Sequence, residues 1–113
     1  MISHVVLMKP RVDLAPADRR AFAEAFRRAV EAIPTVRSVR IGQRVRHGAG
    51  YEASSGDTAD YLAVIDFDDL GGLQAYLAHP AYEELGARFS QSLSAASVYD
   101  FEVGGLDTLS RLR

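Results

Sequence analysis

The residues best suited to chemistry lie in two short stretches of the chain. Tyr76, His79 and Tyr82 surround a His-Pro step, and His4 lies in an early apolar segment. Histidine titrates near neutral pH and can exchange a proton, whereas tyrosine, with a pKa near 10, is better suited to donating a hydrogen bond. We therefore take His4, Tyr76 and Tyr82 as candidate catalytic residues. The structural alternative is a bonded core histidine and tyrosines that close the core.

Composition excludes several kinds of chemistry. The sequence has no cysteine, so disulfides, thiolate nucleophiles and cysteine-ligated metals are ruled out. His4, His79 and Asp66 lack the dense spacing of a metal site, and we expect neither a metal nor a cofactor. A formal net charge of −2 gives no reason to expect binding to nucleic acid. Without a long apolar run or a secretory signal, we expect a cytoplasmic protein that does not bind membranes.

The order of apolar segments and chain breaks predicts the fold. Strands are predicted at 2–9, 36–45, 60–68 and 96–103, and helices at 16–33, 70–79 and from 80 towards 93. This order is β-α-β-β-α-β, which is typical of an α+β, ferredoxin-like fold with a four-stranded antiparallel sheet. We expect one domain over residues 1–104 and a C-terminal tail at 105–113.

The phase of the strands predicts a homodimer. Val5, Leu7, Leu62 and Val64 all fall on the sheet face that the helices do not cover. An exposed apolar face of this extent would be a large hydrophobic patch. A second copy related by two-fold symmetry would cover it, sheet against sheet.

Local signals mark several smaller features. Residues 47–58 form the only long irregular segment, either a mobile loop at a pocket mouth or a plain hairpin connection. Gly42 inside a strand indicates a bulge or a close backbone approach. Asp69 is a predicted helix N-cap, and Asp66 is expected to act at a strand end. His79, before Pro80, is expected to cap carbonyls at a helix C-terminus.

The first helix combines an apolar stripe with a charged surface. Phe22 and Phe26 recur at helical spacing and mark the buried side. Arg19 and Arg27 belong to a set of arginines interleaved with acidic residues. We interpret this set as a solvated face rather than a phosphate-binding patch.

The chain resembles the stress-responsive A/B-barrel (Dabb) family over nearly its whole length. The resemblance rests on His4 before apolar residues, Ile33-Pro34, Gly42 and the terminal Val98-Tyr99-Asp100-Phe101. The most specific part is Phe67 followed by Tyr76-Leu77-Ala78-His79-Pro80-Ala81-Tyr82, where family members typically have Tyr-x-x-His-Pro-x-His. The resemblance implies a dimeric α+β barrel. Most members have no assigned reaction, and one plant member is a polyketide cyclase.

This sequence also differs from the cyclase at a position that matters for its reaction. The cyclase uses the second histidine of that motif as a base, positioned with the earlier tyrosine, which matches Tyr76. The base position is Tyr82 here, and a further pocket histidine of the cyclase matches Tyr61. Because a tyrosine is a poor base at neutral pH, we do not expect the cyclase mechanism to transfer intact. Tyr82 could still donate a hydrogen bond to a carbonyl.

These observations favour a homodimer that binds a small, apolar, partly oxygenated ligand between sheet and helices. The alternatives are a polyketide-cyclase-like or cofactor-independent monooxygenase-like enzyme, and a structural dimer without an open pocket. The first two require a cavity between His4, Tyr76 and Tyr82. The expected ligand-binding residues are Val6, Met8, Phe22, Phe26, Tyr61, Ala63, Ile65 and His79.

Overall fold

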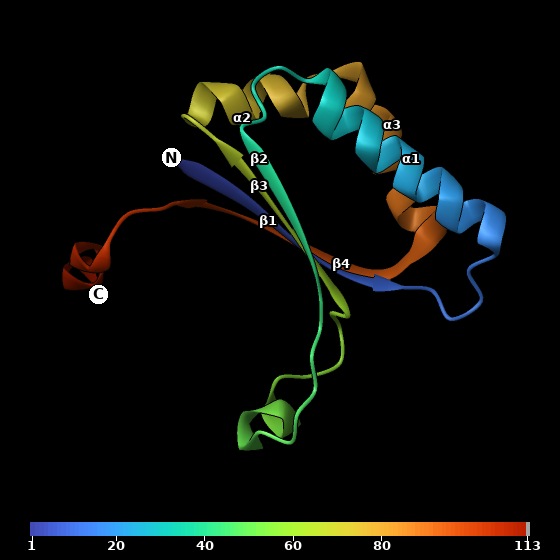
Figure 1. Ribbon diagram of the computed structural model, residues 1–113, viewed down its shortest axis with the longest axis horizontal. Coiled ribbons are helices and arrows are strands. Elements are labelled where there is room, and N and C mark those ends of the chain that lie inside the picture. The colour runs from blue at the N-terminus through green and yellow to red at the C-terminus, as the bar shows by residue number, and fades with distance from the viewer. Residues whose placement is uncertain (113) are drawn as a thin grey trace.

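A four-stranded antiparallel sheet with all its long helices on one face makes up the fold (Figure 1). The computed structural model describes residues 1–112, and the strand order in the sheet is β2-β3-β1-β4. The predicted α+β, ferredoxin-like fold is confirmed. The elements are β1 (Ile2–Pro10), α1 (Pro16–Ala32), β2 (Ser38–Gln43), β3 (Tyr61–Phe67), α2 (Leu70–Leu77), α3 (Pro80–Ser92) and β4 (Leu93–Glu102), with 3₁₀ helices at Gly50–Ser54 and Leu106–Arg111.

Two strands differ from their predicted bounds. β4 begins at Leu93, directly after α3, because its serine- and alanine-rich start pairs with the end of β1 despite showing no apolar alternation. β2 is shorter than predicted because its pairing with β3 ends at Gln43 opposite Tyr61. Gly42 pairs in regular register with Leu62, and a Cβ at Gly42 would meet Leu62 at 3.9 Å, an ordinary contact. The predicted bulge or close approach at Gly42 is therefore wrong.

Side chains cap two consecutive helices. Asp69 is the N-cap of α2 as predicted, and its carboxylate accepts a hydrogen bond from the Gly72 N–H at 2.9 Å. His79 is the N-cap of α3, where its Nδ1 accepts from the Ala81 N–H at 3.0 Å. The predicted C-terminal cap is wrong because Pro80 holds His79 in extended backbone and itself occupies the first helical position.

The hydrophobic core lies between the sheet and the helices. Ala63, Ile65 and Phe67 of β3 are fully buried, and they face α1 and α2. Ala25 and Ala29 on α1 are also fully buried, and the close neighbour of α1 is α3 rather than the sheet. The remaining buried apolar residues are Val6, Met8, Phe26, Ile33, Leu73, Tyr76, Leu85 and Leu93.

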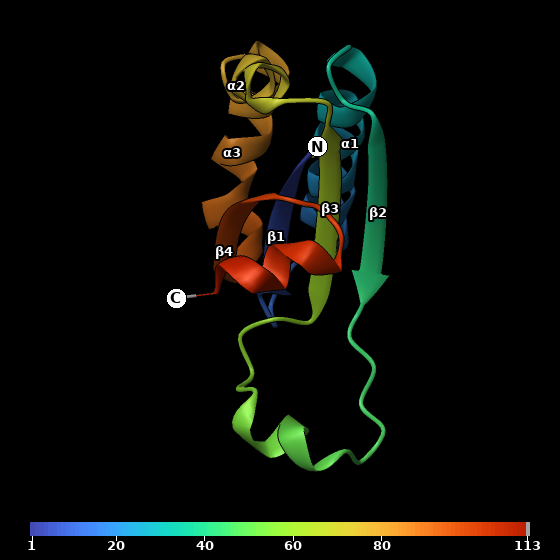
Figure 2. The same ribbon diagram turned by 90° about the vertical axis from the view of Figure 1, so that its left-hand side faces the viewer.

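Within residues 1–112, no element lies directly on the other face of the sheet (Figure 2). Leu7 pairs with Leu62 and Val5 with Val64, so these four apolar side chains form one patch in the middle of the face. Tyr99 and Phe101, which share this face, are 54% and 52% exposed. The predicted strand phase is confirmed, and we call this surface the open face.

A polar cluster interrupts the open face at one end. The Asp66 carboxylate accepts hydrogen bonds from the Ser3 hydroxyl at 2.6 Å and the Ser38 hydroxyl at 2.7 Å, which joins β1, β3 and β2. These two bonds hold the pKa of Asp66 below its usual value. Asp66 lies at the end of β3, as predicted, and serves there as a cross-strand acceptor.

Two segments project away from the sheet. One is the β2–β3 connection with its 3₁₀ helix, and the other is the chain after β4 (Figure 1). The radius of gyration is 15.5 Å, larger than the roughly 13 Å expected for a compact chain of this length. The β2–β3 connection has internal structure, because the Glu52 carboxylate accepts from the His47 and Gly48 N–H groups. Over residues 1–112, none of the helices has the length and apolar character needed to cross a membrane.

Candidate functional site

His4 and Asp100 form a hydrogen-bonded pair on the covered face of the sheet. They are directly opposite each other on β1 and β4, and His4 Nδ1 lies 2.6 Å from Asp100 Oδ1. His4 is only 2% exposed, whereas the Asp100 side chain is 43% exposed. A carboxylate at Nδ1 fixes the orientation of an imidazole ring. Asp100 was not among the predicted site residues, because its contact with His4 depends on the register of two strands at opposite ends of the chain.

Aromatic rings pack tightly around this pair. The Tyr76 ring lies 5.8 Å from the His4 ring, 5.3 Å from Phe67 and 5.0 Å from Tyr82, measured between centroids. Burial raises the pKa of the Tyr76 phenol far above its usual value. Burial, and then the Asp100 charge, raise the pKa of Tyr82. Both phenols stay neutral at physiological pH, so they can donate hydrogen bonds but cannot act as bases.

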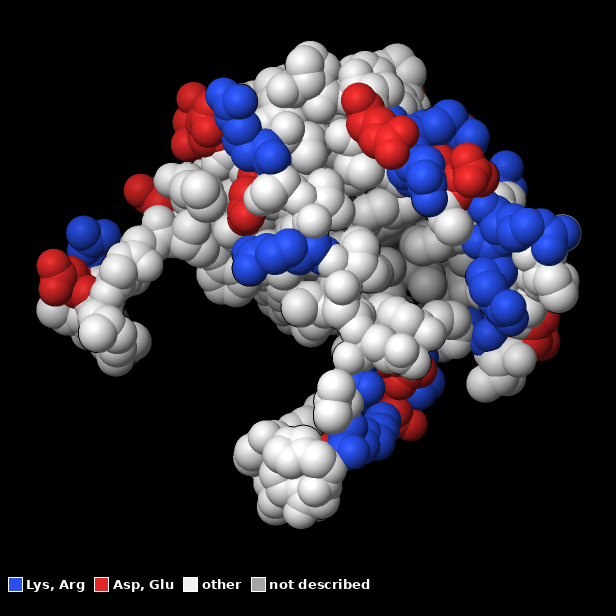
Figure 3. Space-filling view, in the orientation of Figure 1, with Lys and Arg blue, Asp and Glu red and all other residues white. Residues whose placement is uncertain are grey.

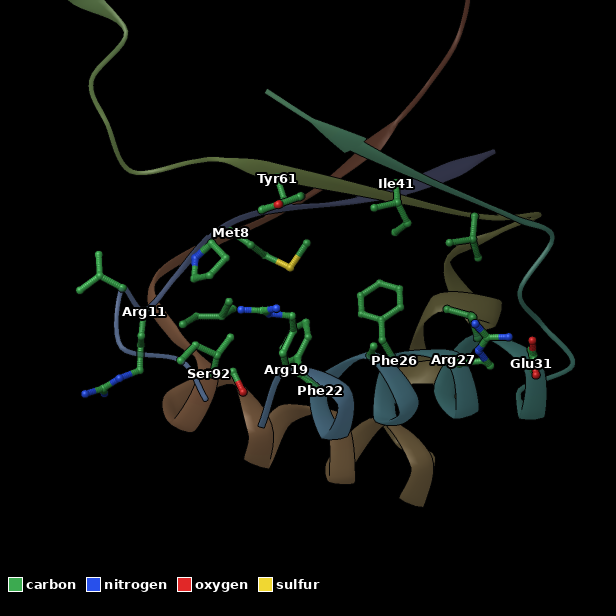
Figure 4. A pocket seen from close by; sticks show the side chains of 17 residues that line it. Met8, Arg11, Arg19, Phe22, Phe26, Arg27, Glu31, Ile41, Tyr61 and Ser92 are labelled. Carbon is green, nitrogen blue, oxygen red and sulfur yellow. The ribbon is translucent and has the colours of Figure 1, made fainter. Parts of the chain in front are cut away.

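A separate cavity of about 880 Å³ lies between α1 and the sheet (Figure 4). Phe22 and Phe26 enter it from α1, while Met8 and Tyr61 lie on the strands opposite and Ile41 lies farther along. This volume is within the roughly 300–1,000 Å³ typical of small-molecule pockets. The other lining residues are Pro10, Arg11, Val12, Leu14, Arg19, Ala23, Arg27, Val30, Glu31, Val39, Ser92 and Leu93.

Comparison with known families now identifies the kind of protein. The family described as the stress responsive A/B barrel domain, or Dabb, matches residues 2–103. The chain belongs to the Dabb family. The match ends one residue after β4, so the projecting segment at 104–112 lies outside it. No curated protein sequence matches this Dabb chain.

Solved structures share the fold at low sequence identity. An Arabidopsis thaliana protein has a TM-score of 0.75 at 19% identity, with 94% of this chain and 98% of that chain covered. A dimeric ferredoxin-like protein of unknown function from Thermobifida fusca gives 0.68 at 22% identity, with 90% of each chain covered. A hydroxynitrile lyase from Passiflora edulis gives 0.75 at 11% identity, with 91% and 93% covered. At these identities the likeness shows the fold alone.

The predicted site residues of this Dabb protein fall into two groups. Met8, Phe22, Phe26 and Tyr61 line the cavity. His4, Tyr76 and Tyr82 are not among its lining residues, so the cavity expected between those three is displaced towards α1. Strand phase places His4 and Met8 on the same face but cannot show which end of that face is hollow. Val6, Ala63 and Ile65 are buried in the core without lining the cavity, and His79 caps α3.

Sequence reasoning missed the charged rim of the cavity. Arg11, Arg19, Arg27 and Glu31 line it. Arg19 and Arg27 are exposed, as the predicted solvated face requires, but they also border the cavity. Figure 3 shows basic side chains, with acidic ones among them, along one side of the hollow. The sequence did contain a signal for this charged rim. Arg19 is three residues before Phe22 on α1, so the two side chains are neighbours on the helix surface. No residue of the β2–β3 connection at 44–60 lines the cavity, so this segment is not a loop at its mouth.

Over residues 1–112, no group of three or more histidine, aspartate or glutamate side chains is placed to hold a metal ion. The polar side chains that line the cavity are the hydroxyls of Tyr61 and Ser92, the guanidinium groups of Arg11, Arg19 and Arg27, and the carboxylate of Glu31, and the other lining side chains are apolar.

Proposed function

We propose that this Dabb protein is a homodimer in which each protomer binds a small, apolar, partly oxygenated molecule between α1 and the sheet. The cavity of about 880 Å³ carries the proposal. Its walls are mainly side chains of Phe22, Phe26, Met8 and Ile41, which favour an apolar ligand through loss of exposed surface on both partners. The Tyr61 hydroxyl is a polar group available to an oxygenated substituent.

The geometry supports binding over the enzymatic alternatives. His4 is the candidate base with the best hydrogen-bond partner, but it is 2% exposed and lies outside the cavity lining. Tyr76 and Tyr82 are neutral phenols within the same packed cluster. A cyclase-like reaction would need a base that faces the substrate, which favours binding over catalysis. A purely structural dimer would need no cavity, which favours binding over a structural role alone.

The homodimer is supported by the open face and by relatives. An apolar patch is formed by Val5, Leu7, Leu62 and Val64, and no element of the described part of the chain, residues 1–112, covers it. Proteins with the same fold from Thermobifida fusca and Bacteroides fragilis are dimeric. A second copy placed on the open face would bury the patch, the outcome that the hydrophobic effect favours.

A neutral fluorescent probe tests the binding function. N-phenyl-1-naphthylamine should bind the wild-type protein saturably, with increased fluorescence. Ala23 lines the cavity on the exposed side of α1, so Ala23→Trp should block it without disturbing the core. We expect at least a roughly tenfold loss of probe affinity, because the bulky ring takes up space that the probe needs.

A tryptophan elsewhere provides the matched control. Ala87 is exposed on α3 and does not line the cavity, so Ala87→Trp should bind the probe as the wild type does. Equal affinity in the Ala23→Trp and Ala87→Trp variants would show that the probe does not occupy this cavity. Unchanged far-ultraviolet circular dichroism would establish that both variants are folded.

A further inference from the structure

At one end of the cavity a single arginine has no acidic side chain beside it among residues 1–112. In Figure 4 the Arg19 guanidinium points into the hollow below Met8 and beside Phe22, while the Arg11 side chain points away. Arg11 is paired with Asp13, with its Nε 3.2 Å from Asp13 Oδ1. Within residues 1–112, Arg19 makes no ion pair with a carboxylate. Arg19 is an exposed residue, so it places an unpaired positive charge at the solvent edge of the apolar walls.

The two ends of the cavity differ in charge. Arg27 and Glu31 lie next to each other at the end away from Arg19, one helical turn apart on α1 (Figure 4). They are not within ion-pair distance of each other, but one positive and one negative side chain leave that end with no formal net charge. The end at Arg19 is positive and is flanked by Met8 and Phe22. The cavity is thus apolar along its length with one cationic end.

We propose that the ligand is an amphipathic monocarboxylic acid whose carboxylate binds the Arg19 guanidinium and whose hydrocarbon part lies along Phe22, Phe26 and Ile41. This inference rests on the proposed binding function and narrows its ligand class. A planar guanidinium matches a carboxylate with two parallel hydrogen bonds, and apolar surroundings strengthen the pair relative to water. A single unpaired arginine suits one negative charge better than the two of a phosphate monoester, particularly with Glu31 lining the same cavity.

Titration calorimetry with octanoate and octanol at pH 7 tests the proposal, because the two probes share a chain and differ in charge. The wild-type protein should bind octanoate at least about tenfold more tightly than octanol. Arg19→Gln should weaken octanoate binding about tenfold or more and leave octanol within twofold. Arg20→Gln, at the neighbouring exposed position outside the cavity lining, should leave both affinities unchanged.

Three other calorimetry results would contradict the proposal in different ways. Equal binding of octanoate and octanol, with no effect of Arg19→Gln, would overturn the carboxylate assignment while supporting an apolar pocket. Tighter binding of octyl phosphate than of octanoate would overturn the preference for one charge. If neither octanoate nor octanol bound the wild-type protein, the binding function itself would fail, and this inference with it.

A second observation concerns the chain after β4. We call residues 104–112 the C-terminal arm. In Figure 2 its 3₁₀ helix stands in front of β1 and β3 on the side of the open face, while in Figure 1 it lies well away from the sheet. The last sheet-like bond is donated by the Val103 N–H to the Met1 carbonyl. Leu106, Leu109 and Leu112 are 85%, 59% and 79% exposed, so the arm presents three leucines to solvent.

We infer that the C-terminal arm packs its leucines against the second copy of this chain. Tyr99 and Phe101 are exposed on the open face near the end of β4, and the arm follows β4 directly. One apolar surface therefore continues from the sheet to the arm. A partner seated on the open face would enter the space between the sheet and the arm that Figure 1 shows. This inference rests on the proposed homodimer and adds a contact outside the Dabb match at 2–103.

Sedimentation equilibrium of the full-length double variant Leu106→Ser/Leu109→Ser tests the arm. The dissociation constant of the dimer should rise about tenfold or more, because each copy loses two buried leucines from the interface. Leu70→Ser is the control, since Leu70 is 54% exposed on α2, away from the open face. If the dimer of the double variant had the same dissociation constant as the wild-type dimer, the arm contact would be overturned. A wild type that is monomeric at all concentrations would overturn the dimer as well.

Discussion

Replacing Val64 by aspartate should convert the protein from a dimer into a folded monomer at micromolar concentration. Val64 lies near the middle of the open face, opposite Val5 on β1 and Arg40 on β2. In the proposed dimer each copy would place a new carboxylate in an apolar interface. Burying a charge costs several kcal/mol, and the symmetry doubles the cost. Arg40 offsets only part of this cost, because its side chain is 71% exposed and already lies 3.6 Å from Asp66. The dissociation constant of the dimer, measured by analytical ultracentrifugation, should therefore rise by at least about a thousandfold.

The monomer should keep its fold, because Val64 points away from the core between sheet and helices. The residues next to it on β3, Ala63 and Ile65, are fully buried on the covered face and remain unchanged. Leu70→Asp adds the same charge at an exposed apolar position on α2 and should stay dimeric. A Val64→Asp variant with the mass of a dimer would rule out the open face as the interface.

Regular patterns made the fold predictable. Pro10 stops β1, Pro34 follows the end of α1 and Pro80 separates α2 from α3, so the order of elements could be determined from breaks and apolar spacing. The open face could be predicted as well, because side chains in a strand alternate strictly between faces. The start of β4 could not, since its Ser94–Ser97 segment becomes a strand through pairing with β1.

The candidate site was less predictable because it depends on distances between elements. The period of α1 identified Phe22 and Phe26 as inward-facing, but only the placement of α1 against β2 and β3 shows that they border a hollow. His4 was predicted to face the covered side, which is confirmed by its 2% exposure. Its partner Asp100 lies 96 residues later in the sequence, and local patterns do not encode such a contact.

Removing the Tyr76 side chain should destabilise the protein far more than removing its hydroxyl alone. Tyr76 is 1% exposed and packs against Phe67 and Tyr82, so Tyr76→Ala would leave a cavity in the core. We expect a loss of about 3–5 kcal/mol in the free energy of unfolding, measured with urea. Tyr76→Phe keeps the ring, and within residues 1–112 the hydroxyl makes no hydrogen bond. That variant should unfold within about 1 kcal/mol of the wild type.

The same pair of variants decides between the two roles proposed for Tyr76. If Tyr76 is a core residue, Tyr76→Phe should bind octanoate and the neutral probe as the wild type does, because the ring lies outside the cavity lining. If the phenol acts on a ligand, Tyr76→Phe would retain its stability yet lose affinity. Burial raises the pKa of this phenol, so a role as proton acceptor would additionally require a nearby positive charge. The groups packed around the ring are Phe67, Tyr82 and His4, the last paired with Asp100. This environment favours the structural role.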